Sequence, residues 1–332
     1  MRPRKVTIVD VARRAGVSIA SVSRFLNNFP SLKEEKKRKI EQVIKELNYR
    51  PLVYARRLAG GKTNSVGLII PGYEGIFNSF YGLEIIKGVG LALEKENIDL
   101  YLHIYWEKDN FSASLIDGVI FADVIDNREQ LLRILKERVP CVVINRKMED
   151  VRVSFVAIDN FQGAYSAVEF LIKHGHRKIA HLGGVMKVQC ARERLEGYKC
   201  ALQRNNLEIR EEYVKIANFS KLEAREKVKE LLSLKSPPTA IFSASDDMAW
   251  EAMNCANELG INVPKDLSII GFDDNPICLQ SKVRLTTVRQ PLIRMACAGV
   301  GILRELIKKE KGFFKKIILP CELVIRDSVA FI

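Results

Sequence analysis

A group of basic and polar side chains near the N-terminus has the chemistry needed to bind DNA. Arg24 carries a guanidinium fork that matches the two acceptors of a guanine in the major groove. Ile19 and Ala20 begin the same predicted helix and are expected to face base edges. Hydroxyl and amide groups nearby are suited to phosphate contacts, which position a protein on DNA without reading its sequence. These phosphate candidates are Ser21, Ser23, Asn27 and Tyr49.

Two short helices joined by a tight turn are predicted to hold these side chains. Thr7 has the spacing of a capping box with the aspartate three residues later, and Ser18 is placed to cap the second helix. Gly16 supplies the left-handed backbone that a helix end often needs. A third helix, predicted to begin at Ser31, closes a small apolar core. Residues 1–50 are therefore predicted to form a helix-turn-helix headpiece, with Thr7 and Ser18 among its candidate DNA contacts.

Positive charge is concentrated in the same segment. Residues 1–62 hold 16 Lys and Arg against 5 Asp and Glu, a net charge of +11, whereas the other residues hold 37 against 35. A small basic module on a near-neutral body is typical of a nucleic-acid binder, and a helical bundle with merely solvated cations is the less favoured alternative. The sequence shows neither an apolar run of ~18 residues nor a signal-peptide pattern, so a cytoplasmic location is expected.

From Val66 onward, apolar runs typical of buried strands alternate with longer helical patterns. This alternation predicts an α/β fold in which helices cover both faces of parallel sheets and ligands bind at the carboxyl ends of the strands. The pattern is too long for one compact core, so two lobes with a cleft between them are expected. The predicted strands are 66–70, 98–105, 118–121, 142–144, 179–182, 240–242 and 267–272, and the predicted helices include 80–95, 161–174, 192–205 and 246–259.

Short motifs along nearly the whole chain resemble those of the lactose/galactose repressor (LacI/GalR) family of transcription regulators. Near the N-terminus they are Thr7-Ile-Val-Asp-Val-Ala, Ala15-Gly-Val-Ser, Val22-Ser-Arg, Leu47-Asn-Tyr-Arg-Pro and Ala55-Arg-Arg-Leu-Ala-Gly. Further along they include Val156-Ala-Ile-Asp-Asn, His174-Gly-His-Arg-Lys-Ile-Ala, Arg192-Glu-Arg-Leu-Glu-Gly-Tyr and Gly271-Phe-Asp-Asp. The resemblance implies that residues 51–63 form a hinge helix and linker, in which Leu58, flanked by Ala55, enters the minor groove as an apolar wedge.

The resemblance also implies that residues 64–332 form a two-lobed effector domain like a type I periplasmic sugar-binding protein. Both lobes are expected to be discontinuous, one from 64–159 with 291–319 and the other from 160–290 with 320–332. The implied effector site uses Arg194, Asp273, Gln290 and Phe219 of one lobe, with Phe80 and Asn145 of the other. Arg and Asp can grip neighbouring sugar hydroxyls, and an aromatic ring can stack on the apolar face of a sugar. The alternatives are surface ion pairs for the charged residues and plain core packing for Phe219 and Phe80.

Several positions depart from the family's pattern. Ser245, also assigned to the effector site, stands where an asparagine is common, and Asn145 replaces a frequent aspartate. Residues 107–115 stand where the family generally has a further helix, which often lies near the subunit interface. These departures leave the identity of the effector and the details of dimerisation open.

Three classes of protein share parts of this pattern. A ligand-controlled repressor accounts for headpiece, hinge and cleft together. It would bind a palindromic operator as a homodimer, alone or as part of a tetramer, and respond to a small metabolite such as a sugar. A transporter's solute-binding protein would need a secretory signal. An enzyme would need a phosphate-binding loop or a catalytic pattern, and the sequence has neither. The sequence therefore predicts a transcription regulator that is not an enzyme and uses no cofactor or metal.

Overall fold

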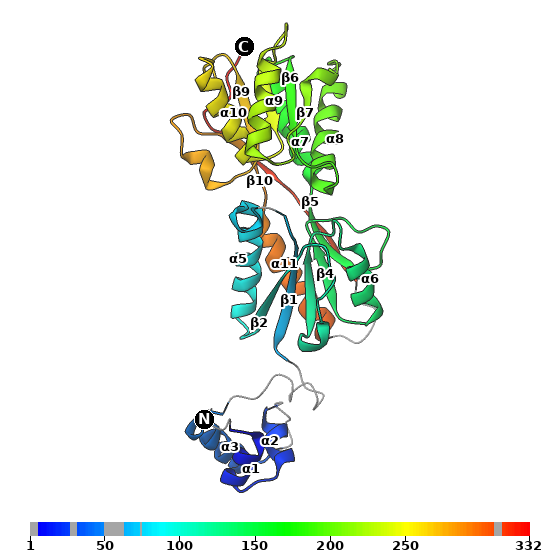
Figure 1. The fold of residues 1–332 in the computed structure, drawn as a ribbon, viewed down its shortest axis with the longest axis vertical. Coiled ribbons are helices and arrows are strands. Elements are labelled where there is room, and N and C mark those ends of the chain that lie inside the picture. Colours follow the sequence, from blue (N-terminus) through cyan, green and yellow to red (C-terminus); the bar gives the residue numbers. More distant parts are fainter. Residues whose placement is uncertain (1–5, 27–31, 50–62, 74, 309–313) are drawn as a thin grey trace.

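The computed structural model describes residues 6–26, 32–49, 63–73, 75–308 and 314–332 (Figure 1). Three helices form the N-terminal headpiece, namely α1 (Ile8–Ala15), α2 (Ile19–Leu26) and α3 (Glu34–Glu46). The helix-turn-helix prediction is confirmed. The predicted hinge at 51–63 lies outside the described residues except for its last residue, so the hinge helix stays a prediction.

The caps of the first two helices are those that the sequence predicts. The Oγ1 of Thr7 accepts from the backbone N–H of Asp10 at 3.4 Å, and the carboxylate of Asp10 accepts from the N–H of Thr7 at 2.9 Å. Gly16 ends α1 with φ at 64°, and the Oγ of Ser18 accepts from the N–H of Ser21 at 3.2 Å. The ends of the first two helices are therefore fixed by contacts between residues about three apart in the sequence.

The third helix starts later than the sequence suggests. Ser31 was predicted to begin it, but α3 begins at Glu34, and Lys33 takes the N-cap position without a side-chain cap. A lysine has no acceptor atom for the free N–H groups of the first turn. The carboxylates of Glu34 and Glu35 instead place negative charge at the positive end of the helix dipole. The three helices bury a shared apolar core that includes Val11, Val22 and Ile40.

Two six-stranded sheets form the centre of the remaining described chain (Figure 1). The first has the order β11-β5-β4-β3-β1-β2 and the second β12-β10-β9-β8-β6-β7, and all pairings are parallel except that of β10 with β12. The first sheet contains β1 (Ser65–Pro71), β2 (Asp99–Tyr105), β3 (Gly118–Ala122), β4 (Cys141–Ile144), β5 (Ser154–Ile158) and β11 (Lys316–Leu319). The second contains β6 (Ile179–Gly183), β7 (Val214–Ile216), β8 (Ala240–Ser243), β9 (Ser268–Asp273), β10 (Thr286–Arg289) and β12 (Glu322–Val324). The chain passes between the sheets after β5, β10 and β11.

Helices cover both sheets. Those of the first lobe are α5 (Phe80–Glu94), α6 (Arg128–Lys136) and α11 (Leu292–Lys308), and those of the second are α7 (Asn160–Lys173), α8 (Gln189–Arg204), α9 (Lys221–Leu232) and α10 (Asp246–Glu258). Short 3-10 turns occur at Ile76–Asn78, Ala113–Leu115, Glu211–Tyr213 and Pro276–Leu279. The predicted α/β alternation is confirmed, and each predicted strand and helix coincides with an observed one to within about three residues at its ends. None of these helices, in the part of the chain that is described, has the length and apolar character needed to cross a bilayer.

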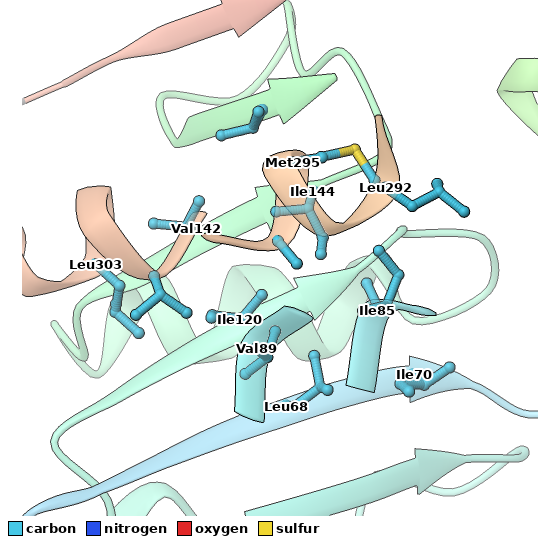
Figure 2. Close-up of a cluster of buried hydrophobic side chains, with 14 of the residues drawn as sticks. Leu68, Ile70, Ile85, Val89, Ile120, Val142, Ile144, Leu292, Met295 and Leu303 are labelled. Carbon is cyan, nitrogen blue, oxygen red and sulfur yellow. The ribbon is translucent and has the colours of Figure 1, made fainter. Parts of the chain in front are cut away.

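The core of the first lobe lies between its sheet and the helix pair α5 and α11 (Figure 2). Leu68 and Ile120 of the sheet meet Val89 of α5 and Leu303 of α11 there, and all four are buried. Gly88 lets the helices approach closely, because a Cβ built on it would lie 2.7 Å from the Cβ of Ala296. This packing holds the carboxyl ends of the strands in fixed positions at one edge of the sheet.

The segment between β2 and β3 is short, as predicted. All of residues 106–117 are described, and they contain one 3-10 turn in place of a full helix. The Phe111 ring packs on β1 instead, where a Cβ at Gly67 would lie 2.9 Å from its Cζ. Strand β2 is the edge strand of this sheet, and its Tyr101 and Leu102 are exposed.

Candidate ligand cleft and DNA interface

The candidate base-reading residues lie on the outer face of α2. Ile19 is 48% exposed, and Ala20 and Arg24 are also exposed. Ser21 and Ser23 are half-buried, while Ser18 is exposed and bonds to Ser21 as a cap. The exposed side chains of α2 are therefore free of the headpiece core and can approach a duplex.

The remaining candidate DNA contacts differ in how the structure places them. Thr7 is exposed, and its hydroxyl is used in the capping box of α1. Tyr49 is buried in the headpiece core, so only its hydroxyl could serve as a phosphate contact. Asn27, Ala55 and Leu58 lie outside the described residues.

A cavity of about 550 Å³ opens between the two lobes at the carboxyl ends of both sheets. All seven candidate effector residues line it: Phe80, Asn145, Arg194, Phe219, Ser245, Asp273 and Gln290. They come from residues far apart in the chain, because parallel strands bring their carboxyl ends to the same edge. A cleft of this size with a few convergent polar groups has the form of a small-molecule site.

Arg194 is the most firmly held charged group of the cleft. It projects from α8 and is only 3% exposed. Its Nε donates to Asn160 at 3.0 Å and its Nη1 to the carbonyl of Ala244 at 2.6 Å, while the guanidinium carbon lies 3.7 Å from the centroid of the Phe272 ring. Nη1 also lies 3.8 Å from a carboxylate oxygen of Asp273. These contacts fix the guanidinium plane before any ligand arrives.

Asp273 and Gln290 form a second polar group beside Arg194. The Nε2 of Gln290 donates to Asp273, while its Oε1 is buried without a hydrogen-bond partner among the described residues. Burial raises the pKa of Asp273, and the nearby Arg194 charge opposes that shift. A buried acceptor without a partner costs free energy, so a ligand hydroxyl that donates to Gln290 would be favoured.

The first lobe provides the facing polar group. Asp123 follows β3 and accepts from the N–H of Val124 at 2.6 Å and from the Nδ2 of Asn145 at 3.4 Å. The Oδ1 of Asn145 is buried without a hydrogen-bond partner in the described part of the chain, and the hydroxyl of Tyr81 is buried next to Asn145. The pKa of Asp123 is raised because the carboxyl is buried, and the Arg146 guanidinium 3.5 Å away opposes part of this shift. These side chains of the first lobe can accept hydrogen bonds from several ligand hydroxyls and donate hydrogen bonds to them.

Some residues of the cleft were not predicted from the sequence. One predicted residue, Ser245, also has a structural role. Asp123, Tyr81, Tyr73 and Trp106 all line the cavity but were not predicted. Asp123 could have been found, because it comes just after the predicted strand 118–121 at the ligand edge. Ser245 lines the cleft, but its Oγ also caps α10 by accepting from the N–H of Met248 at 3.3 Å.

Residues with a left-handed backbone gather at this cleft. The φ angles are 78° at Asp123, 67° at Asn145 and 60° at Phe219. Such values are uncommon for residues other than glycine and are most costly for a bulky residue such as Phe219. Each residue comes just after a strand, where this turn of the backbone places its side chain in the cavity wall.

The ring of Phe219 is packed against the backbone of Gly184. A Cβ built on Gly184 would lie 2.1 Å from the Cζ of Phe219, closer than any real contact. Gly184 follows β6 and Phe219 follows β7, the neighbouring strand at the edge of the second sheet. The Phe219 ring therefore occupies space that is free only because residue 184 has no side chain.

We predict that Gly184→Ala displaces the Phe219 ring and lowers affinity for a ligand of the cleft about tenfold. The displaced ring would no longer offer the ligand the same face, and overpacking of this kind typically costs about 1–3 kcal/mol. Isothermal calorimetry would measure the affinity. The matched control is Gly301→Ala, because a Cβ at Gly301 meets nothing within 4 Å. Unchanged affinity in Gly184→Ala would exclude the Phe219 ring as a ligand contact.

Comparison with known proteins places both parts of the chain. Residues 7–51 match the model for bacterial regulatory proteins of the lacI family, and residues 168–329 match the periplasmic binding protein-like domain. The curated "Probable HTH-type transcriptional repressor ExuR" of Bacillus subtilis is 35% identical over 98% of each chain. Catabolite control protein A of Priestia megaterium is 34% identical, over 97% of this chain and 99% of that protein.

Solved structures agree with these matches. The complex of the transcriptional regulator CelR with cellobiose has a TM-score of 0.75 at 27% identity, over 98% of this chain and 100% of that one. The lac repressor dimer bound to operator and the anti-inducer ONPF has a TM-score of 0.86 at 24% identity with the same coverage, a likeness of fold. Headpiece, two-lobed body and cleft define a DNA-binding transcription regulator with a periplasmic-binding-protein-like domain. The chain belongs to the LacI family of bacterial regulators, and it is not an enzyme.

Proposed function

We propose that this regulator is a repressor that binds a palindromic operator as a homodimer and responds to a sugar in its cleft. The observation that carries the proposal is the set of polar groups that converge on the cavity, where the buried acceptors of Asn145 and Gln290 have no partners among the described residues. Vicinal hydroxyls of a sugar would supply the missing donors. Arg194 and Asp273 would grip the same hydroxyls, and Phe219 would stack on an apolar sugar face.

The headpiece would read DNA through α2. Its exposed N-terminal residues and Arg24 would enter the major groove, as in other helix-turn-helix proteins. In a twofold dimer, two such helices would bind half-sites about one helical turn apart. Leu58 from each subunit would enter the minor groove between them as a wedge.

Exposed apolar side chains support dimerisation. Leu83 and Leu91 on α5, with Tyr101 and Leu102 on β2, are exposed on the first lobe. Leu222 and Leu279 are exposed on the second lobe. Exposed apolar groups on both lobes are typical of a surface covered by a partner, and a homodimer would bury the same surface on each subunit.

Control by the effector would act through the hinge. A helix of about six residues is marginal in water, so the predicted hinge helix would form only when dimer and DNA hold it. A sugar that favours one angle between the lobes would favour or disfavour that ordered state. A coupling free energy of about 1–3 kcal/mol is enough for about 5- to 150-fold control of operator affinity.

A single screen tests this function. Sugars are added to the full-length protein while its melting temperature and its affinity for operator DNA are measured. A cleft ligand raises the melting temperature by mass action and should also change operator affinity. A sugar that raises the melting temperature but leaves operator affinity unchanged at saturation would contradict sugar control.

We predict that Arg24→Ala weakens operator binding by about 1–3 kcal/mol and relaxes specificity at one base of each half-site. The guanidinium fork would lose two hydrogen bonds to a guanine, whereas Arg14→Ala removes an equally exposed charge from α1. Binding to a library of operator variants measures both effects. Base reading by Arg24 is wrong if the two variants lose affinity equally on operator and on random DNA.

A further inference from the structure

The cleft extends along the edge of the first sheet for more than the width of one sugar ring. Its lining residues follow four neighbouring strands: Asn145 follows β4, Asp123 follows β3, Tyr73 follows β1 and Trp106 follows β2. Neighbouring strands lie about 4.8 Å apart, so the three steps from β4 to β2 cover about 14 Å. A pyranose ring built from bonds of about 1.5 Å is only about 6 Å across with its hydroxyls. The row of strand ends is therefore longer than one ring and has room for a second.

The two ends of this row differ in chemistry. The end at β3 and β4 holds the polar groups of Asp123 and Asn145, together with the buried hydroxyl of Tyr81. The end at β1 and β2 holds two large aromatic side chains, and Trp106 is 58% exposed. An exposed indole at the wall of a cleft is typical of a ring that a ligand covers.

Contacts with the neighbouring chain hold the Trp106 ring in place although it is exposed. Its ring packs on the backbone of Gly72, where a Cβ would lie 2.6 Å from the indole Cδ2. The N–H of Gly72 also donates to the carbonyl of Tyr105 at 2.6 Å, which holds the two chain segments together. The backbone therefore supports one side of the indole. A ligand that stacks on the other side loses little side-chain conformational entropy.

The charges of the cleft are already paired. Three cations line it among the described residues: Arg194 lies 3.8 Å from Asp273, Lys221 lies 2.8 Å from Asp247, and Lys187 pairs with Asp126. Asp123 adds a fourth carboxylate to the lining. A carboxylate or phosphate on the ligand would have to displace one of these partners, whereas neutral hydroxyls leave the existing ion pairs in place.

From this arrangement we infer that the effector is a neutral two-ring sugar, a disaccharide or a glycoside with a second ring. Its inner ring lies between Asn145 and Arg194, and its outer ring stacks on Trp106. The inference rests on the proposed sugar response and adds the size and the charge of the ligand. It assigns Trp106 as a residue that determines specificity.

The test compares three groups of sugars on the full-length protein by calorimetry. The neutral disaccharides are cellobiose, lactose, maltose and sucrose; the monosaccharides are glucose and galactose; the anionic sugars are glucose 6-phosphate and galacturonate. We expect the tightest ligand to be a disaccharide that binds at least tenfold more tightly than either monosaccharide. Trp106→Ala should weaken that disaccharide about tenfold and leave monosaccharide affinity within twofold.

Phe77→Ala is the matched control, because Phe77 is 59% exposed nearby but does not line the cleft. It should leave all affinities unchanged, which separates stacking from a general loss of an exposed ring. The inference is overturned if an anionic sugar or a monosaccharide binds most tightly, or if Trp106→Ala binds the disaccharide like the wild type. In those cases a sugar still binds and the proposed function survives. Binding by none of these sugars would count against the sugar response itself, and the inference would fall with it.

Discussion

Arg194→Lys should bind the sugar effector at least 100-fold more weakly than the wild-type protein. A lysine keeps the charge but has no planar fork, so it cannot donate to Asn160 and Ala244 while it stacks on Phe272 and faces the ligand. Each hydrogen bond from the guanidinium to a ligand hydroxyl would contribute about 1.5–3 kcal/mol, and the loss of two of them corresponds to about 100-fold or more. Calorimetry with the effector would measure the change.

The matched control for this variant is Arg192→Lys. Arg192 lies on the same helix two residues earlier, but it is exposed and donates only to carbonyl groups of residues 186 and 187. Its replacement should leave effector affinity unchanged. Operator binding without effector should persist in both variants, since the headpiece is untouched. Wild-type effector affinity in Arg194→Lys would remove Arg194 from the site.

Leu58→Lys should lower operator affinity by about 100-fold and abolish operator bending. Insertion of an apolar side chain unstacks a base step and bends the duplex, and a charged side chain cannot make that contact. The added positive charge by itself favours DNA through the phosphates, so a loss of affinity cannot come from repulsion. Fluorescence energy transfer between the operator ends measures the bend, and titration measures the affinity.

Leu58→Met is the control for the wedge, because it keeps an apolar side chain of similar volume. Bending should persist in this variant. Effector affinity should be the same in both variants and in the wild type, since residue 58 precedes in the sequence all the residues that line the cleft. The wedge assignment is wrong if Leu58→Lys bends the operator as strongly as the wild type does.

Local signals made much of the fold predictable. The cap at Thr7, the turn at Gly16 and the cap at Ser18 act over about three residues, so the sequence alone contains all the partners. The buried strands were predictable because burial on both faces requires continuous apolar runs, as in β3 and β4. The three-residue strands β7 and β12 lack such runs, and only pairing with neighbours defines them.

The sequence led to part of the cleft lining but not to its interactions. The resemblance to the LacI/GalR family led to seven candidate side chains, all of which line the cleft, while Asp123 and Trp106 were not among them. The pairing of Asp123 with Asn145 joins residues 22 apart, and the bonds of Arg194 join residues 34 and 50 apart. No local pattern encodes such distances.

The sequence by itself therefore determined that a basic three-helix headpiece precedes an α/β body, because caps, charge and apolar periodicity act along the chain. Only the tertiary structure decided which charges neutralise each other across the cleft, which acceptors remain without partners, and that Trp106 lies at the same sheet edge as Asn145. These properties depend on strand order and burial. Strand order sets distance, and burial sets the cost of an unpaired polar group.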